Sequence, residues 1–184
     1  MTKNWKKTKY KNLTYTHHPN YKLDLLLAEK ANLFIDSICT LLKVDTLKKQ
    51  IDYTLVRNFD EFANLLGFDY FSYEFTSGIA STHESYIKTM KGPFHAHELV
   101  HLVSHFMADF ILYEGIANFL GTKLVEEKRY YKTMSDLKRY MEYSDYSIKD
   151  FFEKPYQNYY KNPFGAFLCE YIYTEYGMDK LIYL

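Results

Sequence analysis

The alternation of apolar and polar residues predicts two strands and two helices in the first part of the chain. Residues 12–17 and residues 51–56 alternate with period two, which is typical of strands. Residues 21–44 carry apolar side chains at helical spacing, which predicts a long amphipathic helix. Residues 59–66 form a shorter helical pattern that ends at Gly67.

The rest of the pattern predicts two more strands followed by helices. Residues 76–80 and 84–89 are candidate strands around a turn, and apolar helical segments follow them to the C-terminus. A small mixed sheet in the N-terminal half, followed by a mostly helical C-terminal half, indicates the α+β class. The length of 184 residues predicts one domain that spans residues 1–184.

Composition and charge exclude several classes of protein. The 23 basic and 23 acidic residues balance, so nothing points to nucleic acid as a partner. No apolar run reaches the roughly 18 residues of a membrane span, and the polar start shows no signal peptide. We therefore expect a cytoplasmic protein or the mature form of an exported one. Cys39 and Cys169 each lie in an apolar helical pattern, which predicts two buried thiols.

Residues 97–101 read His-Glu-Leu-Val-His, and this motif carries the candidate chemistry. Residues four apart on a helix lie on one face about 6 Å apart, so His97 and His101 can direct two imidazole nitrogens at one metal ion. Glu98 is rotated by about 100° from His97, where a base can take a proton from a metal-activated water. The apolar neighbours indicate a buried helix, whereas an exposed helix face without metal is the alternative.

A third metal ligand is expected because catalytic zinc usually takes three protein ligands and leaves a fourth position to water. His105 is excluded, since three successive helical turns span about 12 Å and cannot converge on one ion. The metzincin spacing fails because Met107 stands six residues after His101, where that family has a histidine. Glu114, in a second apolar helical pattern over residues 113–120, is the better candidate.

Two further polar residues near the motif are candidates for supporting roles. Asn118 lies one turn beyond Glu114, where its carbonyl can accept the second N–H of a ligand histidine, as residues around metal ligands commonly do. A solvated helix position is the alternative for Asn118. His95, two residues before the first ligand, is the remaining histidine expected to line the cleft.

The motif at 97–101, followed by Glu114-Gly115-x-Ala117-x-Phe119, resembles the gluzincin metallopeptidases, in particular their peptidase-MA-like branch. Residues 165–172 and 176–181 are similar to the closing helices of that branch, so the resemblance covers roughly residues 50–184. The link of 12 residues between the second histidine and Glu114 is shorter than in the best-known gluzincins. The resemblance implies a zincin-like fold and a Zn²⁺ ion bound by His97, His101 and Glu114.

The resemblance also implies roles close to the substrate. Gluzincins place an edge strand along the cleft before the active-site helix, so residues 84–89 are a candidate for pairing with a peptide. An ordinary inner strand is the alternative. In related gluzincins, a Tyr or His from the C-terminal half stabilises the oxyanion, and Tyr160 is the candidate here, with Tyr171 second. Packing is the alternative role for both tyrosines.

The sequence therefore predicts a zinc-dependent metallopeptidase that hydrolyses peptide bonds in a peptide or protein substrate. Glu98 is the expected general base, which takes a proton from the attacking water and delivers it to the leaving amine. A non-catalytic zinc-containing binding module with a zincin-like fold is the alternative, and it predicts metal binding without turnover. A deformylase is excluded because neither Cys39 nor Cys169 lies in the motif that supplies its cysteine ligand.

Overall fold

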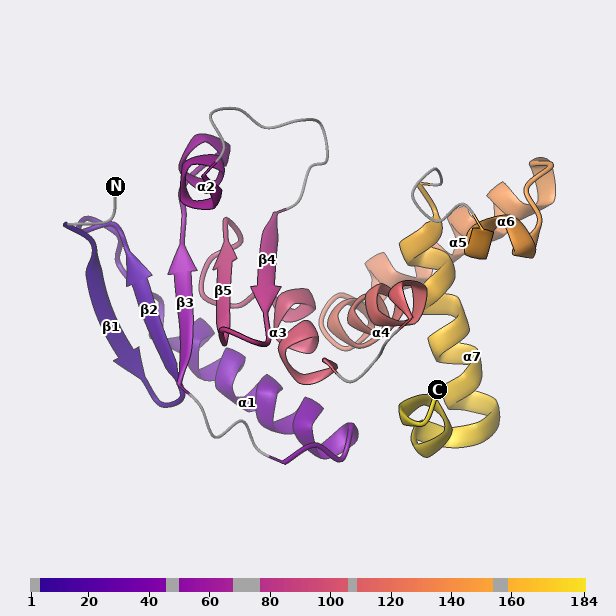
Figure 1. The fold of residues 1–184 in the computed structure, drawn as a ribbon, viewed down its shortest axis with the longest axis horizontal. Helices are drawn as coiled ribbons and strands as arrows, with labels where there is room; N and C mark the ends of the chain where they lie inside the picture. The colour runs from indigo at the N-terminus through magenta and orange to yellow at the C-terminus, as the bar shows by residue number, and fades with distance from the viewer. Residues whose placement is uncertain (1–3, 46–49, 68–76, 106–108, 154–158) are drawn as a thin grey trace. The chain divides into compact units, whose positions relative to one another are not determined.

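The computed structural model describes residues 4–45, 50–67, 77–105, 109–153 and 159–184. Within these residues, a mixed five-stranded sheet occupies the N-terminal half and the C-terminal half is mostly helical (Figure 1). The prediction of the α+β class is therefore confirmed. The chain divides into two compact units, Met1–Val103 and Ser104–Leu184. A single domain over residues 1–184 stays a prediction.

The first unit contains the sheet, in which three parallel strands lie between two antiparallel outer strands. The spatial order is β1-β2-β3-β5-β4, and β2, β3 and β5 run parallel (Figure 1). All four strands that the sequence predicts are present in the sheet. The strand bounds are β1 (Lys6–Tyr10), β2 (Leu13–His17), β3 (Ile51–Leu55), β4 (Gly78–Ser81) and β5 (Tyr86–Thr89).

Strand β1 was not predicted from the sequence. None of its side chains is buried, so it shows no apolar alternation that a pattern could detect. A tight turn joins it to β2: Tyr10 pairs with Leu13, and Lys11 in the turn has a positive φ of 51°. Its lysines are typical of edge strands, where charged side chains discourage pairing with other chains.

Helix α1 (Leu25–Leu41) connects the parallel strands β2 and β3 and packs against helix α3 (Ala96–Val103). Asp24 sets its start, because the Asp24 carboxylate accepts two backbone N–H groups of the first turn at 2.9 and 3.1 Å. The helix is therefore a few residues shorter than the predicted range 21–44. Its type and position along the chain are as predicted.

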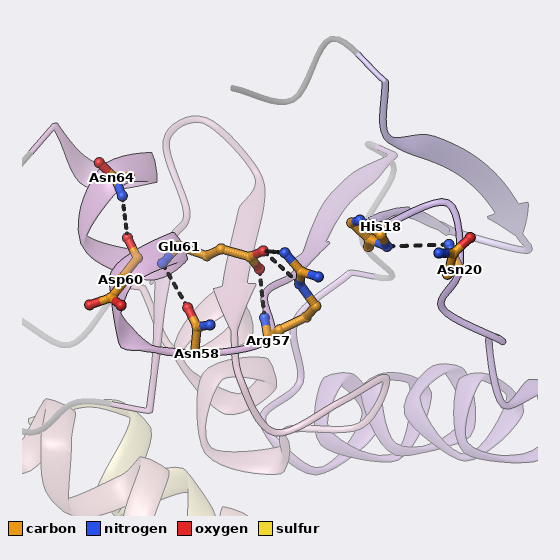
Figure 2. A network of polar contacts seen from close by, with 7 residues as sticks. All are labelled: His18, Asn20, Arg57, Asn58, Asp60, Glu61 and Asn64. Carbon is orange, nitrogen blue, oxygen red and sulfur yellow. Dashed lines mark hydrogen bonds and ion pairs between the residues drawn. The ribbon is translucent and has the colours of Figure 1, made fainter.

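A polar network stabilises the start of helix α2 (Phe59–Leu66), as Figure 2 shows. Asn58 Oδ1 accepts the N–H of Glu61 at 3.0 Å, and Glu61 Oε2 accepts the N–H of Arg57 at 2.9 Å. The Arg57 guanidinium also donates to Glu61 Oε1, with its Nε 2.6 Å away. This hydrogen bonding lowers the pKa of the Glu61 carboxyl. Gly67 ends the helix with a φ of 82°, as the sequence predicts.

The sheet and helices α1 and α3 form the core of the first unit. Tyr15, Tyr53 and Ile87 are neighbours in register across the three parallel strands, and all three are fully buried. The rings of the two tyrosines lie 5.0 Å apart. Leu99 and Val103 of α3 are also fully buried, so α3 is anchored in this core.

The second unit is helical in the part of the chain that the structure describes. Its helices are α4 (Phe110–Lys123), α5 (Glu127–Tyr143), α6 (Ile148–Glu153) and α7 (Lys161–Ile182), with a break in α7 at Gly177. Helix α4 packs along α7, and α5 contacts both. A buried cluster forms the core of this unit and consists of Ile111, Leu137, Phe151 and Phe164. None of the described helices is long and apolar enough to cross a bilayer.

Candidate metal centre

Buried contacts to the sheet fix the start of helix α3, which carries the His-Glu-x-x-His motif. The Tyr15 hydroxyl donates to the Pro93 carbonyl at 3.0 Å, and the Tyr53 hydroxyl accepts the backbone N–H of His95 at 3.0 Å. Burial raises the pKa of both phenols, so both stay protonated at neutral pH. Gly92 allows the chain to enter this segment with a φ of 80°. The sheet thus places the first turn of the helix.

The two histidines of the motif direct ring nitrogens toward each other. Nε2 of His97 and Nε2 of His101 are 3.0 Å apart, and the ring planes stand at 85°. Tetrahedral zinc with Zn–N bonds of about 2.0–2.1 Å separates two ligand nitrogens by about 3.3 Å, close to the observed distance. His101 is buried and His97 is half-buried. The separation is therefore close to the one that two imidazole ligands of one ion need.

Glu98, the candidate base, is buried, with 5% of its surface exposed. Its Oε1 atom lies 4.0 Å from Nδ1 of His95. Both side chains rest against Gly78 of strand β4, where a Cβ atom would lie 2.7 Å from His95 Nδ1 and 3.0 Å from Glu98 Cγ. Glycine at this position leaves room for both side chains, so β4 fixes where the candidate base lies.

The hydroxyl of Thr89 holds the side chain of His95 in place. Thr89 Oγ1 donates to the Ser77 carbonyl at 3.1 Å and accepts the N–H of Lys91 at 3.0 Å. His95 Nδ1 lies 2.8 Å from the same hydroxyl oxygen, so a buried hydrogen bond with Thr89 orients the imidazole ring. The sequence indicated His95 only as a residue near the cleft; its contact with Thr89 is visible only in the structure.

Glu114, the candidate third ligand, lies on helix α4 in the second unit. The side-chain amide of Asn162, on α7, donates to Glu114 Oε2 at 3.1 Å. Asn118 donates to the backbone carbonyl of Glu114 at 2.9 Å, within its own helix. A role for the Asn118 side-chain carbonyl beside a ligand histidine stays a prediction. Sequence reasoning missed Asn162 because it stands 48 residues from Glu114, and no local pattern connects them.

Tyr160, the candidate oxyanion donor, takes part in aromatic packing at the start of α7. Its ring stacks on Tyr140 with the centroids 4.5 Å apart, and the Tyr159 ring meets its edge at 5.5 Å. Tyr160 also packs against the buried cluster of the second unit. Tyr171, the second candidate, is half-exposed on α7 and stacks on Phe167. The packing role is thus observed for Tyr160, whereas Tyr171 makes ring contacts at the surface. The oxyanion role stays a prediction for both.

The strand predicted at residues 84–89 is an inner strand of the sheet. Strand β5 pairs with β3 on one side and with β4 on the other, so the edge role for these residues is wrong. The reason is that β4 precedes β5 as its antiparallel partner and closes this side of the sheet itself. Among the described strands, β4 is the outer strand on this side of the sheet, and its Gly78 lies against Glu98 and His95.

Comparison with known proteins does not identify a family. No protein-family model matches the chain, and no curated protein matches it at a significant level. The resemblance to gluzincins therefore rests on the motif residues and their spacing.

Proposed function

We propose that this chain is a zinc-dependent metallopeptidase of the gluzincin type, with His97, His101 and Glu114 as metal ligands. The observation that carries the proposal is the pair of imidazole nitrogens 3.0 Å apart on the buried helix α3. Glu114, in the Glu-Gly-x-Ala segment that follows the motif, would add a carboxylate oxygen as the third ligand. Two imidazoles and one carboxylate are a common ligand set of catalytic zinc.

Glu98 supplies the proton transfer in the proposed reaction. Zinc, when bound, acts as a Lewis acid that acidifies water and polarises the substrate carbonyl. The Glu98 carboxylate takes a proton from the attacking water and delivers it to the amine nitrogen as the C–N bond breaks. The packing of Glu98 against Gly78 and its 4.0 Å distance from His95 support this role, because they restrict the orientation of the carboxylate.

The edge strand β4 supports a peptide as the substrate. Among the described strands, β4 has one neighbour, and an extended peptide can add to such an edge through backbone hydrogen bonds. Because Gly78 of β4 lies against Glu98, a peptide paired with β4 would run close to the candidate base. The proposed substrate is therefore a peptide or protein segment bound in an extended conformation.

Replacement of the candidate base tests the proposed function. We expect Glu98→Gln to bind zinc with the affinity of the wild type and to lose about 100-fold to 10,000-fold in the hydrolysis rate of a peptide library, because the amide cannot accept the proton. Zinc affinity is measured by competition with a chromophoric chelator, and hydrolysis by mass spectrometry of the library. Glu84→Gln, an exposed carboxylate of the same unit, is the matched control and should retain full activity.

Two outcomes would argue against the proposal. Full activity of Glu98→Gln would remove Glu98 as the base. Stoichiometric zinc in the wild type without hydrolysis of any peptide would favour the non-catalytic binding module instead.

A further inference from the structure

Helices α4 and α7 approach each other so closely that their backbones touch at two glycines. A Cβ atom on Gly115 would lie 2.5 Å from the carbonyl oxygen of Gly165, and one on Gly165 would lie 3.0 Å from Gly115 Cα and against the carbonyl oxygen of Ile111. Side chains at either position would push the helices apart. Because Gly115 follows Glu114 directly, this contact keeps the first turn of α7 beside the candidate ligand.

Asn162 reaches Glu114 from that first turn of α7. Its Nδ2 lies 3.1 Å from Glu114 Oε2, and since a carboxylate oxygen only accepts, the NH₂ side of the amide must face Glu114. This orientation leaves Asn162 Oδ1 buried, with no hydrogen-bond partner among the residues that the structure describes. Buried polar atoms without partners are rare in native proteins and are often found at functional sites.

We propose that Asn162 is a positioning residue that orients the Glu114 carboxylate for the metal, an inference that rests on the proposed function. The hydrogen bond to Oε2 restricts rotation of the carboxylate about its last bond, so that Glu114 would bind the ion through its other oxygen. One-oxygen binding keeps the coordination number low and leaves a position for water. The contact between Gly115 and Gly165 holds the start of α7, and with it Asn162, beside Glu114.

Zinc affinity of the apoprotein tests this inference without any substrate. We expect Asn162→Leu, which keeps the branched shape and loses the donor, to weaken zinc binding about 10-fold to 100-fold, as loss of a residue behind a metal ligand typically does. Tyr130→Phe is the matched control, because it removes a hydrogen bond of the same unit to another carboxylate, Glu170 Oε2 at 2.8 Å. This control should bind zinc like the wild type.

A double-mutant cycle separates a positioning role from general destabilisation. In a Glu114→Ala background, Asn162→Leu should cause no further loss of affinity, because the group that it orients is gone. Asn162→Ala serves the same cycle if the leucine variant does not fold. Cobalt substitution adds a spectroscopic readout: the visible absorption of Co²⁺ should weaken in Asn162→Leu, as expected when the carboxylate binds through both oxygens and the coordination number rises.

The outcomes distinguish this inference from the proposed function. If Glu114→Ala weakens zinc binding and neither Asn162 variant does, Asn162 does not position the ligand, while the proposed function stands. The inference would also be overturned if Asn162→Leu lowered zinc affinity by the same factor in the wild type and in the Glu114→Ala background. A wild-type chain that binds no zinc, or binds it equally well without Glu114, overturns both.

Discussion

Helix α3 and helix α4 carry candidate ligands, but they are held in place by different kinds of contact. Helix α3 is fixed by the sheet: two buried tyrosines, Tyr15 and Tyr53, bond to the chain just before it, and its apolar side chains lie in the core. Helix α4 is held by other helices: it packs along α7, which it touches through the backbone at Gly115 and Gly165, and it contacts α5. The side-chain amide of Asn162 also donates a hydrogen bond to the Glu114 carboxylate.

The difference predicts how each helix responds to substitution. Several contacts place the histidine pair, so loss of one of them leaves the others to hold α3. The Glu114 carboxylate accepts a hydrogen bond from Asn162 of α7, next to the tight backbone contact of Gly115 with Gly165, so a change at either place should displace it. We therefore expect the carboxylate to be the more sensitive part of the proposed centre.

Gly115→Ala should give the largest effect on stability. The added methyl group would lie 2.5 Å from the carbonyl oxygen of Gly165. Because a helix backbone cannot move aside as a flexible side chain can, we expect a loss of about 3 kcal/mol in the free energy of unfolding. Denaturation by urea measures this loss. An unchanged free energy of unfolding would show that α4 and α7 are not in backbone contact.

The reaction rates of the two buried thiols show which unit Gly115→Ala destabilises. Cys169 lies between α7 and α4, with its Sγ 3.7 Å from the Leu112 carbonyl, and burial raises the pKa of its thiol to about 12. Cys39 is buried in α1 of the first unit. Gly115→Ala should therefore speed the reaction of Cys169 with a thiol reagent and leave the rate for Cys39 unchanged.

Gly78→Ala tests a glycine contact in the first unit. Its main expected effect is on the rate of peptide hydrolysis and not on the free energy of unfolding. The methyl group would meet His95 Nδ1 at 2.7 Å and displace Glu98, and we expect peptide hydrolysis to fall about 100-fold while zinc affinity is retained. Gly67→Ala is the control, because no atom lies within 4 Å of its added Cβ and only backbone strain at φ 82° results. Equal activity of the Gly78 variant and the wild type would contradict the role of β4.

Glu61→Gln should give the smallest effect, confined to the stability of the first unit and dependent on pH. Arg57 lowers the pKa of Glu61 in the folded chain, so the stabilisation is present above the ordinary value of 4.5 and is lost as the pH falls through the folded pKa. We expect a loss of about 1 kcal/mol at pH 7 that disappears in acid. Asp136→Asn, in an exposed pair with Lys132, should change little at either pH. An effect of Glu61→Gln that persists in acid would contradict this explanation.

Local patterns in the sequence were sufficient for most of the first unit and for the histidine pair. The spacing of His97 and His101 is four residues, so a helix alone brings them together. Helix α2 was predicted with its observed bounds because Gly67 marks its end. Strand β1 was not predicted, because none of its side chains is buried and its sequence therefore shows no apolar alternation.

The remaining features depend on contacts between residues that are far apart in the sequence. Tyr53 bonds to His95 across 42 residues, and Asn162 bonds to Glu114 across 48. The edge position of β4 follows from the order of strands in space, which alternation of apolar residues does not encode. Such contacts follow from tertiary packing, and a single sequence contains no periodic signal for them.

Zinc binding by the purified chain tests the central claim most directly. Apoprotein prepared without an affinity-tag metal should bind one zinc ion per chain, and His97→Ala and Glu114→Ala should each weaken binding by more than about 100-fold, since both remove a direct ligand. Absence of stoichiometric zinc in the wild type, or affinity unchanged in both variants, would contradict the account.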